Sequence, residues 1–171
     1  MTRRFSAEPL PADLLVDLLD LARRAPSAGY SQGVHLLLLD GDQVPWFWQV
    51  TGAGAWFDKV SPGVTTAPAI VLPLADPGAY TARYAEPDKA EPVLEGEEGP
   101  GLDREEAWPV PYWLTDTAMA VQNLLLLAED RGLGALFFGL FGGEDELLAA
   151  LGVPAGVRPC LLYTSPSPRD S

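Results

Sequence analysis

The sequence predicts a single domain that combines helices with a β-sheet, of the α+β or α/β class. Its 171 residues suit one domain, and 47% hydrophobic with 20% charged residues is an ordinary globular composition. Amphipathic helical stretches alternate with short apolar runs along the chain. A domain of this length buries about two-thirds of its unfolded surface, which is enough for a hydrophobic core.

The charge balance excludes several classes of function. A net charge of −13 argues against binding nucleic acid or an anionic membrane surface. No apolar run approaches the roughly 20 residues of a spanning helix, and the first residues lack the pattern of a signal peptide, so we expect a cytoplasmic protein. One His and one Cys exclude a His/Cys metal cluster and a disulfide framework.

The first half of the chain predicts two helices and two strands. Residues 11–24 place leucines on one helical face, and Pro26 ends this helix. The apolar run 34–39 predicts a buried strand, residues 43–56 a helix, and residues 68–74 a second strand. We assign the aromatic side chains of this region to core packing; they are Trp46, Phe47, Trp48, Trp56 and Phe57.

The second half begins with a long acidic loop, residues 86–111, which is rich in Pro and Gly. Residues 112–131 predict the longest helix, and its apolar composition is typical of a core or an oligomer interface. A third strand is expected over 133–140 and a short helix over 144–151. A fourth strand is expected to begin near Val157.

The end of the chain does not continue this pattern. Residues 160–170, CLLYTSPSPRD, resemble the conceptual translation of a sequencing adapter. We therefore expect a domain over 1–159 that is incomplete at both ends, followed by a non-native tail over 160–171.

Two local motifs predict other chemistry. Gly29-Tyr30-Ser31-Gln32-Gly33 matches the G-x-S-x-G pattern of serine hydrolases, with Ser31 as the nucleophile. That motif needs a strand before it and a helix after it, whereas the reverse order is predicted here. The sole histidine, His35, comes only four residues after Ser31, whereas such hydrolases place the catalytic histidine late in the chain, after the acid. A serine hydrolase is thus a remote alternative. The glycines of 132–134 and 139–143 fit neither the dinucleotide fingerprint nor the P-loop.

Four motifs in order resemble the FMN-dependent nitroreductase family. They are the opening Arg3-Arg4-Phe5-Ser6, the segment APSAGYSQG at 25–33, the helix headed by Pro111-Tyr112-Trp113 with GLGALFFG at 132–139 after it, and Leu151-Gly152-Val153-Pro154. The resemblance covers residues 2–159. It departs from the family at Tyr30, which replaces Asn, and at Gly33, which replaces Pro.

The resemblance implies an α+β, three-layer fold with a mixed, mainly antiparallel sheet flanked by helices. It also implies an intertwined homodimer with one FMN in each of two interface clefts. Arg3 would contact the flavin ring and ribityl chain, and Pro26, Ser27 and Ala28 would pack over the ring of the partner subunit. The strand end Phe138-Gly139-Leu140 would face the ring with its backbone, and Gly at 139 allows close approach.

The implied activity is hydride transfer from NAD(P)H to flavin N5 and then to a nitroaromatic compound, a quinone or a similar electrophile. The cofactor supplies this chemistry, so no catalytic acid or base is expected among the side chains. Trp108, Tyr112 and Trp113 would lie near the cleft and contact the acceptor, or would anchor the acidic loop to the core. The alternatives are a flavin-binding protein of the same fold without NAD(P)H turnover, and an inactive truncated fragment.

Overall fold

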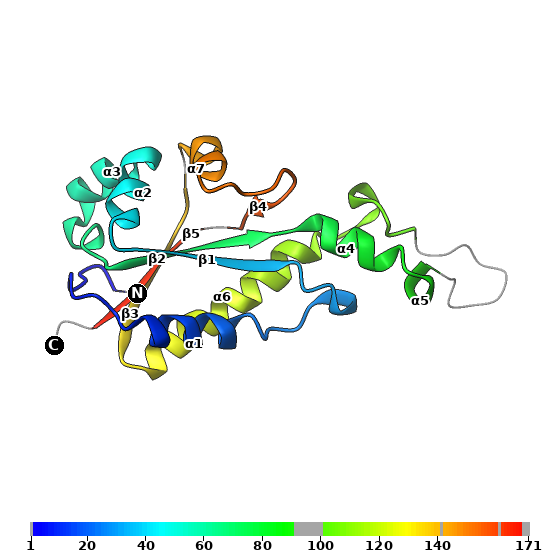
Figure 1. Ribbon diagram of the computed structural model, residues 1–171, viewed down its shortest axis with the longest axis horizontal. Coiled ribbons are helices and arrows are strands. Elements are labelled where there is room, and N and C mark those ends of the chain that lie inside the picture. Colours follow the sequence, from blue (N-terminus) through cyan, green and yellow to red (C-terminus); the bar gives the residue numbers. More distant parts are fainter. Residues whose placement is uncertain (1, 91–100, 141, 161, 169–171) are drawn as a thin grey trace.

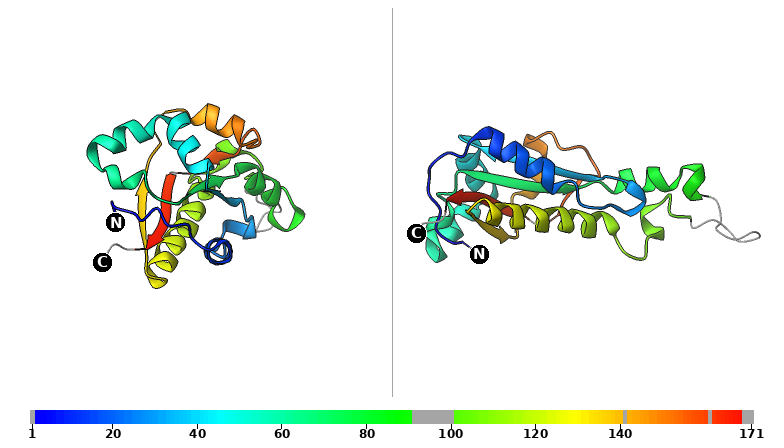
Figure 2. Two further views of the ribbon diagram at one scale, coloured as in Figure 1. Left: turned by 60° about the vertical axis from the view of Figure 1, so that its left-hand side comes forward. Right: turned by 90° about the horizontal axis from the view of Figure 1, so that it is seen from below.

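The computed structural model describes residues 2–90, 101–140, 142–160 and 162–168. It confirms the α+β class: a small sheet lies between two layers of helices (Figure 1). Figure 2 shows the three layers from one end, with α2, α3 and α7 on one face of the sheet and α1 and α6 on the other.

The sheet has the strand order β1-β2-β5-β3, and β4 also pairs with β2. Every described pairing is antiparallel. In the β1–β2 ladder, Val34 lies opposite Ala75 and Asp40 opposite Ala69. All seven residues of β2 are buried, which makes it the centre of the core. The strands are β1 (Val34–Asp40), β2 (Ala69–Ala75), β3 (Leu133–Phe138), β4 (Arg158–Pro159) and β5 (Leu162–Pro168).

One face of the sheet is covered by α1 (Ala12–Ala22) and the long helix α6 (Tyr112–Asp130). Leu18 of α1 and Leu124 of α6 meet in a cluster that includes Val71 of β2. Each helix thus buries one apolar stripe against the sheet, which removes that stripe from water.

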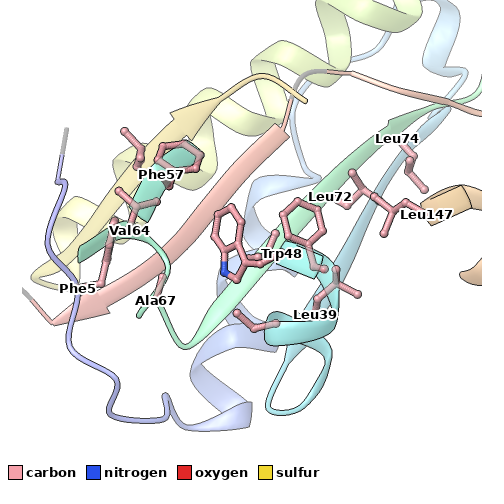
Figure 3. Packing of buried hydrophobic residues seen from close by; sticks show 13 residues of the cluster. Phe5, Leu39, Trp48, Phe57, Val64, Ala67, Leu72, Leu74 and Leu147 are labelled. Carbon is pink, nitrogen blue, oxygen red and sulfur yellow. The ribbon is translucent and has the colours of Figure 1, made fainter. Parts of the chain in front are cut away.

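The other face is covered by α2 (Gln43–Thr51), α3 (Ala53–Val60) and α7 (Glu144–Ala150). Trp48, Phe57, Leu72 and Leu147 belong to the cluster of buried residues in this core, which Figure 3 shows. The segment 43–56 is helical as predicted, but it is not continuous, because Gly52 adopts φ +65° and ends α2 where α3 begins. A left-handed glycine is the usual way to end a helix, so the chain turns there.

Helix α4 (Pro77–Tyr84) follows β2 directly and was not predicted from the sequence. Asp76 caps this helix by accepting a hydrogen bond from the Ala79 amide, at 3.4 Å, and Pro77 occupies its first turn. An Asp-Pro pair is a start signal for a helix. The predicted loop 86–111 contains α5 (Pro87–Ala90) and the single turn η3 (Glu105–Ala107), while residues 91–100 lie outside the described part of the chain.

The tail predicted to be non-native contributes β5, between β2 and β3. Its described pairing with β2 is confined to Tyr163 and Thr164, so Pro166 and Pro168 lie where β5 pairs with β3 alone, a position at which proline, lacking an N–H, is tolerated. The expected strand near Val157 is the two-residue β4. The foreign origin of 160–171 stays a prediction.

Within the described residues, no helix combines the length and the hydropathy that a membrane span needs.

Candidate functional site

A cavity of about 780 Å³ opens where the N-terminal arm, the α2–α3 corner and the end of β3 meet. This volume falls within the range of small-molecule and cofactor sites. Its lining is mostly apolar, and among the described lining residues Arg3 carries the single charge. The lining residues are Arg3, Thr51, Gly52, Ala53, Trp56, Phe57, Val60, Ser61, Leu136, Phe137, Phe138, Gly139 and Gly142.

The backbone on both sides of Arg3 is fixed to the fold. The Thr2 amide donates to the Ala135 carbonyl on β3 at 3.0 Å, and the Phe5 amide donates to the Gly63 carbonyl at 3.0 Å. Phe5 is buried in the core. Between these anchors Arg3 remains exposed at the cavity, so its cation is available to a ligand.

Close backbone approach explains a glycine on β3. A Cβ added to Gly134 would lie 2.5 Å from Oγ1 of Thr2, which is closer than real Cβ contacts. The arm that carries Arg3 therefore rests on β3 only because residue 134 has no side chain.

Phe138 forms an aromatic wall whose orientation is set by its neighbours. Its ring stacks on Trp48, with centroids 5.6 Å apart and an interplanar angle of 22°. It also meets Phe57 edge to face, with centroids 5.1 Å apart. Such pairs stabilise by about 0.5–1.5 kcal/mol beyond their burial. Phe138 thus serves the core and the cavity at once, as Phe57 does.

The cavity brings together three of the predicted cofactor residues, Arg3, Phe138 and Gly139. Leu140, predicted beside them, is partly buried against the core cluster and is not among the residues lining the cavity.

Trp56 was assigned to core packing, and this assignment was wrong. Its side chain is 60% exposed and lines the cavity. The sequence did not reveal that Trp56 is exposed, because it lies in a continuous aromatic stretch. The break at Gly52 turns α3 so that Trp56 faces outward. An exposed tryptophan beside a cavity can contact a planar ligand.

The predicted residues Pro26, Ser27 and Ala28 lie elsewhere. They lead into the turn η1 (Ala28–Tyr30), which lies toward the α4 end of the molecule, whereas the N-terminal arm, α2, α3 and β3 lie at the opposite end (Figure 1). A single chain therefore does not bring this turn to its own cavity.

A buried carboxylate holds this turn. Oδ2 of Asp116 accepts hydrogen bonds from the Ala28 amide and from the Tyr80 hydroxyl, both at 2.8 Å. Asp116 is 3% exposed. Burial and, second, the hydrogen bond to Asp116 raise the pKa of Tyr80 well above its usual range. The phenol therefore remains protonated and continues to donate.

The three predicted substrate residues cluster near the same turn. Trp108 and Trp113 are buried with Tyr80, and the Trp108 indole donates to the Leu102 carbonyl at 2.9 Å. Tyr112 contacts Trp108 edge to face and is 41% exposed. Of the three, Tyr112 offers the largest exposed fraction to a ligand or a partner.

Ser31 and His35, the residues that a serine hydrolase would use, interact with different partners. The Ser31 hydroxyl donates to the Ala28 carbonyl at 2.7 Å, and Nε2 of His35 lies 4.0 Å from Oδ2 of Asp76. Within the described residues no hydrogen bond joins Ser31 to His35, so no base is poised to activate this serine.

Comparison with known proteins identifies the family of the chain. The family model described as the nitroreductase family matches residues 1–164. Three solved structures share the fold. A nitroreductase-like family protein from Bacillus cereus is 19% identical, with a TM-score of 0.67 over 100% of this chain and 81% of that chain. An oxidoreductase containing FMN is 18% identical, with a TM-score of 0.68 over 98% and 72%. The hypothetical oxidoreductase YcnD from Bacillus subtilis is 24% identical, with a TM-score of 0.69 over 98% and 62%.

Proposed function

This chain belongs to the nitroreductase family, and we propose on that premise that it is an FMN-dependent oxidoreductase. It would take hydride from NAD(P)H and pass it to a nitroaromatic compound, a quinone or a similar small electrophile. The observation that carries the proposal is the cavity shared by Arg3, Phe138 and Gly139. A similar structure described as an oxidoreductase containing FMN supports the choice of cofactor.

The residues around the cavity fit a flavin ring. Phe138 offers a flat apolar surface fixed by Trp48, and Gly139 leaves room for a ligand to approach the backbone. Arg3 supplies one positive charge at the rim, which stabilises negative charge on a bound ring. Bound FMN would supply the atom that accepts and returns hydride, while the protein orients the ring and tunes its electronics.

A homodimer is part of the proposal. Tyr112, Met119 and Leu126 are 41%, 40% and 59% exposed, and their spacing of seven residues places them along one stripe of α6. An exposed apolar stripe on a long helix is suited to burial against a second copy. In such a dimer the turn containing Pro26, Ser27 and Ala28 would reach the cavity of the partner and complete the flavin site.

Steady-state kinetics test the activity. The purified chain loaded with FMN should oxidise NADH or NADPH when a quinone or nitroaromatic acceptor is present. A chain that binds FMN but shows no turnover above free FMN would instead be the alternative, a flavin-binding protein without NAD(P)H oxidation. The Gly139→Trp variant, which fills the cavity, is the matched inactive control.

A further inference from the structure

The turn between α1 and β1 is strained in an unusual way. Tyr30 and Gln32 adopt φ of +60° and +54°, and within the described part of the chain they are the only non-glycine residues with positive φ. For a bulky aromatic residue this conformation is an outlier, and it persists only where the surroundings enforce it.

The surroundings do enforce it. Asp116 binds the Ala28 amide, Nε of Arg83 donates to the Gly29 carbonyl at 2.9 Å, and the Gln32 amide donates to Oγ of Ser27 at 3.0 Å. Arg83 is itself fixed by a two-pronged contact with Asp88, at 2.7 Å for each nitrogen. The backbone of the turn is therefore anchored from α4, from α6 and from within.

The side chain of Tyr30, in contrast, does not help to hold the turn in place. Tyr30 is 76% exposed, more than any other described large apolar side chain. No hydrogen bond of its hydroxyl is found among the described residues. Strained residues of this kind cluster at ligand-binding sites, so Tyr30 is better explained by a contact outside its own chain.

We propose that Tyr30 enters the cavity of a second copy of this chain, where its ring selects flat aromatic electron acceptors. The cavity is lined by residues of the N-terminal arm, α2, α3 and β3, and these elements lie at the opposite end of the chain from η1 (Figure 1), so the contact must be made between copies. The cavity presents exposed aromatic faces, Trp56 at 60% and Phe137 at 36% exposure. A tyrosine ring opposite them would enclose a planar acceptor. This inference rests on the proposed function.

A pair of glycine substitutions tests the role of the ring. Both Tyr30→Gly and Gln32→Gly relieve the same kind of strain, so both should raise Tm slightly. Only Tyr30→Gly removes an aromatic ring. It should lower kcat/KM for a naphthoquinone by roughly 2- to 12-fold, as expected for one aromatic contact. It should leave ferricyanide reduction unchanged, because that inorganic acceptor needs no stacking. Tyr30→Phe should retain the wild-type preference.

Mixed dimers test whether Tyr30 acts between copies. A Tyr30→Gly copy retains an open cavity but lacks the ring, while a Gly139→Trp copy has the ring but a filled cavity. Their mixed dimer should regain the wild-type preference for the quinone over ferricyanide in its one open cavity. If the preference remains that of Tyr30→Gly alone, or if Tyr30→Gly and Gln32→Gly have equal quinone kinetics, the inference is wrong. A wild-type chain that neither binds FMN nor oxidises NAD(P)H would instead refute the proposed function itself.

Discussion

The hydroxyl of Tyr80 donates a hydrogen bond to the carboxylate of Asp116 at 2.8 Å, and both side chains are almost fully buried, at 0% and 3% exposure. The same carboxylate oxygen accepts the Ala28 amide. One buried group thus joins α4, α6 and the turn that we place at the cavity of the partner. Removing Asp116 would leave the buried Tyr80 hydroxyl without this acceptor, which costs about 1–3 kcal/mol, whereas removing the Tyr80 hydroxyl leaves Asp116 its bond from Ala28.

This pair predicts how stability depends on pH. The pKa of Tyr80 is raised by burial first and by Asp116 second, so below pH 10 the phenol is protonated in both the folded and unfolded chains. Above pH 10 the unfolded chain loses this proton while the folded chain keeps it. The free energy of unfolding should therefore fall by up to about 1.4 kcal/mol per pH unit.

Urea unfolding between pH 8 and pH 11.5 measures this slope. Tyr80→Phe should reduce the alkaline slope by the contribution of one proton, because it removes the buried phenol whose pKa is raised. An unchanged slope in Tyr80→Phe would contradict the role given to this buried phenol.

Glycine at position 29 is required on two grounds. Its φ is +60°, and an added Cβ would lie 2.6 Å from the ring of Tyr84. Gly41 has a similar φ of +51° but open space around its Cα. Gly41→Ala should therefore cost about 1 kcal/mol of backbone strain, and Gly29→Ala should cost about 1–3 kcal/mol more from overpacking. Equal losses in denaturant unfolding would show that Tyr84 moves aside freely.

Arg3 and Arg4 provide a matched pair for the cavity. Both are exposed, but only Arg3 lines the cavity. Arg3→Gln should weaken FMN binding roughly 10- to 100-fold, the value of one hydrogen bond to a charged group. Arg4→Gln should bind FMN as the wild type does. Fluorescence titrations of the two variants make the comparison, and equal affinities would remove Arg3 from the site.

The exposed stripe of α6 predicts the oligomeric state. Light scattering after size exclusion should give the mass of a dimer for the wild type. Met119→Glu places a charge in the stripe and should shift the mass toward a monomer, since an unpaired charge is costly to bury. Ala149→Glu introduces the same negative charge on an exposed face of α7, on the other side of the sheet, and this variant should remain dimeric. If the Met119→Glu variant remained a dimer, the interface would not include this stripe of α6.

Hydrophobic periodicity predicted most of the helices and strands, because the residues that an element buries recur in the sequence at the spacing of that element. Helix α6 begins at Tyr112 as predicted and ends one residue early, and β1 and β2 agree within a residue at each end. The helix break at Gly52 was missed because the aromatic pattern continues through it, and only the left-handed φ of one glycine divides it.

The site was predicted less completely because it combines residues that no local pattern connects. Arg3 and Gly139 are far apart in sequence, and the resemblance to a family brought them together before the fold did. Trp56 could not be found in this way, since its exposure depends on how α3 packs. The structural role of Asp116 could not be predicted either, because it is a single acid within an apolar helix. Its role depends on the hydrogen bonds that it accepts from Tyr80 and Ala28.

The proposed function requires that the cavity beside Arg3 and Gly139 bind FMN. Titration of FMN with the purified chain, followed by flavin fluorescence, tests this most directly. We expect saturable quenching near one FMN per chain, and loss of that quenching in Gly139→Trp with thermal unfolding unchanged. A folded wild-type chain that leaves flavin fluorescence unquenched, or a Gly139→Trp variant that binds FMN equally well, would contradict it.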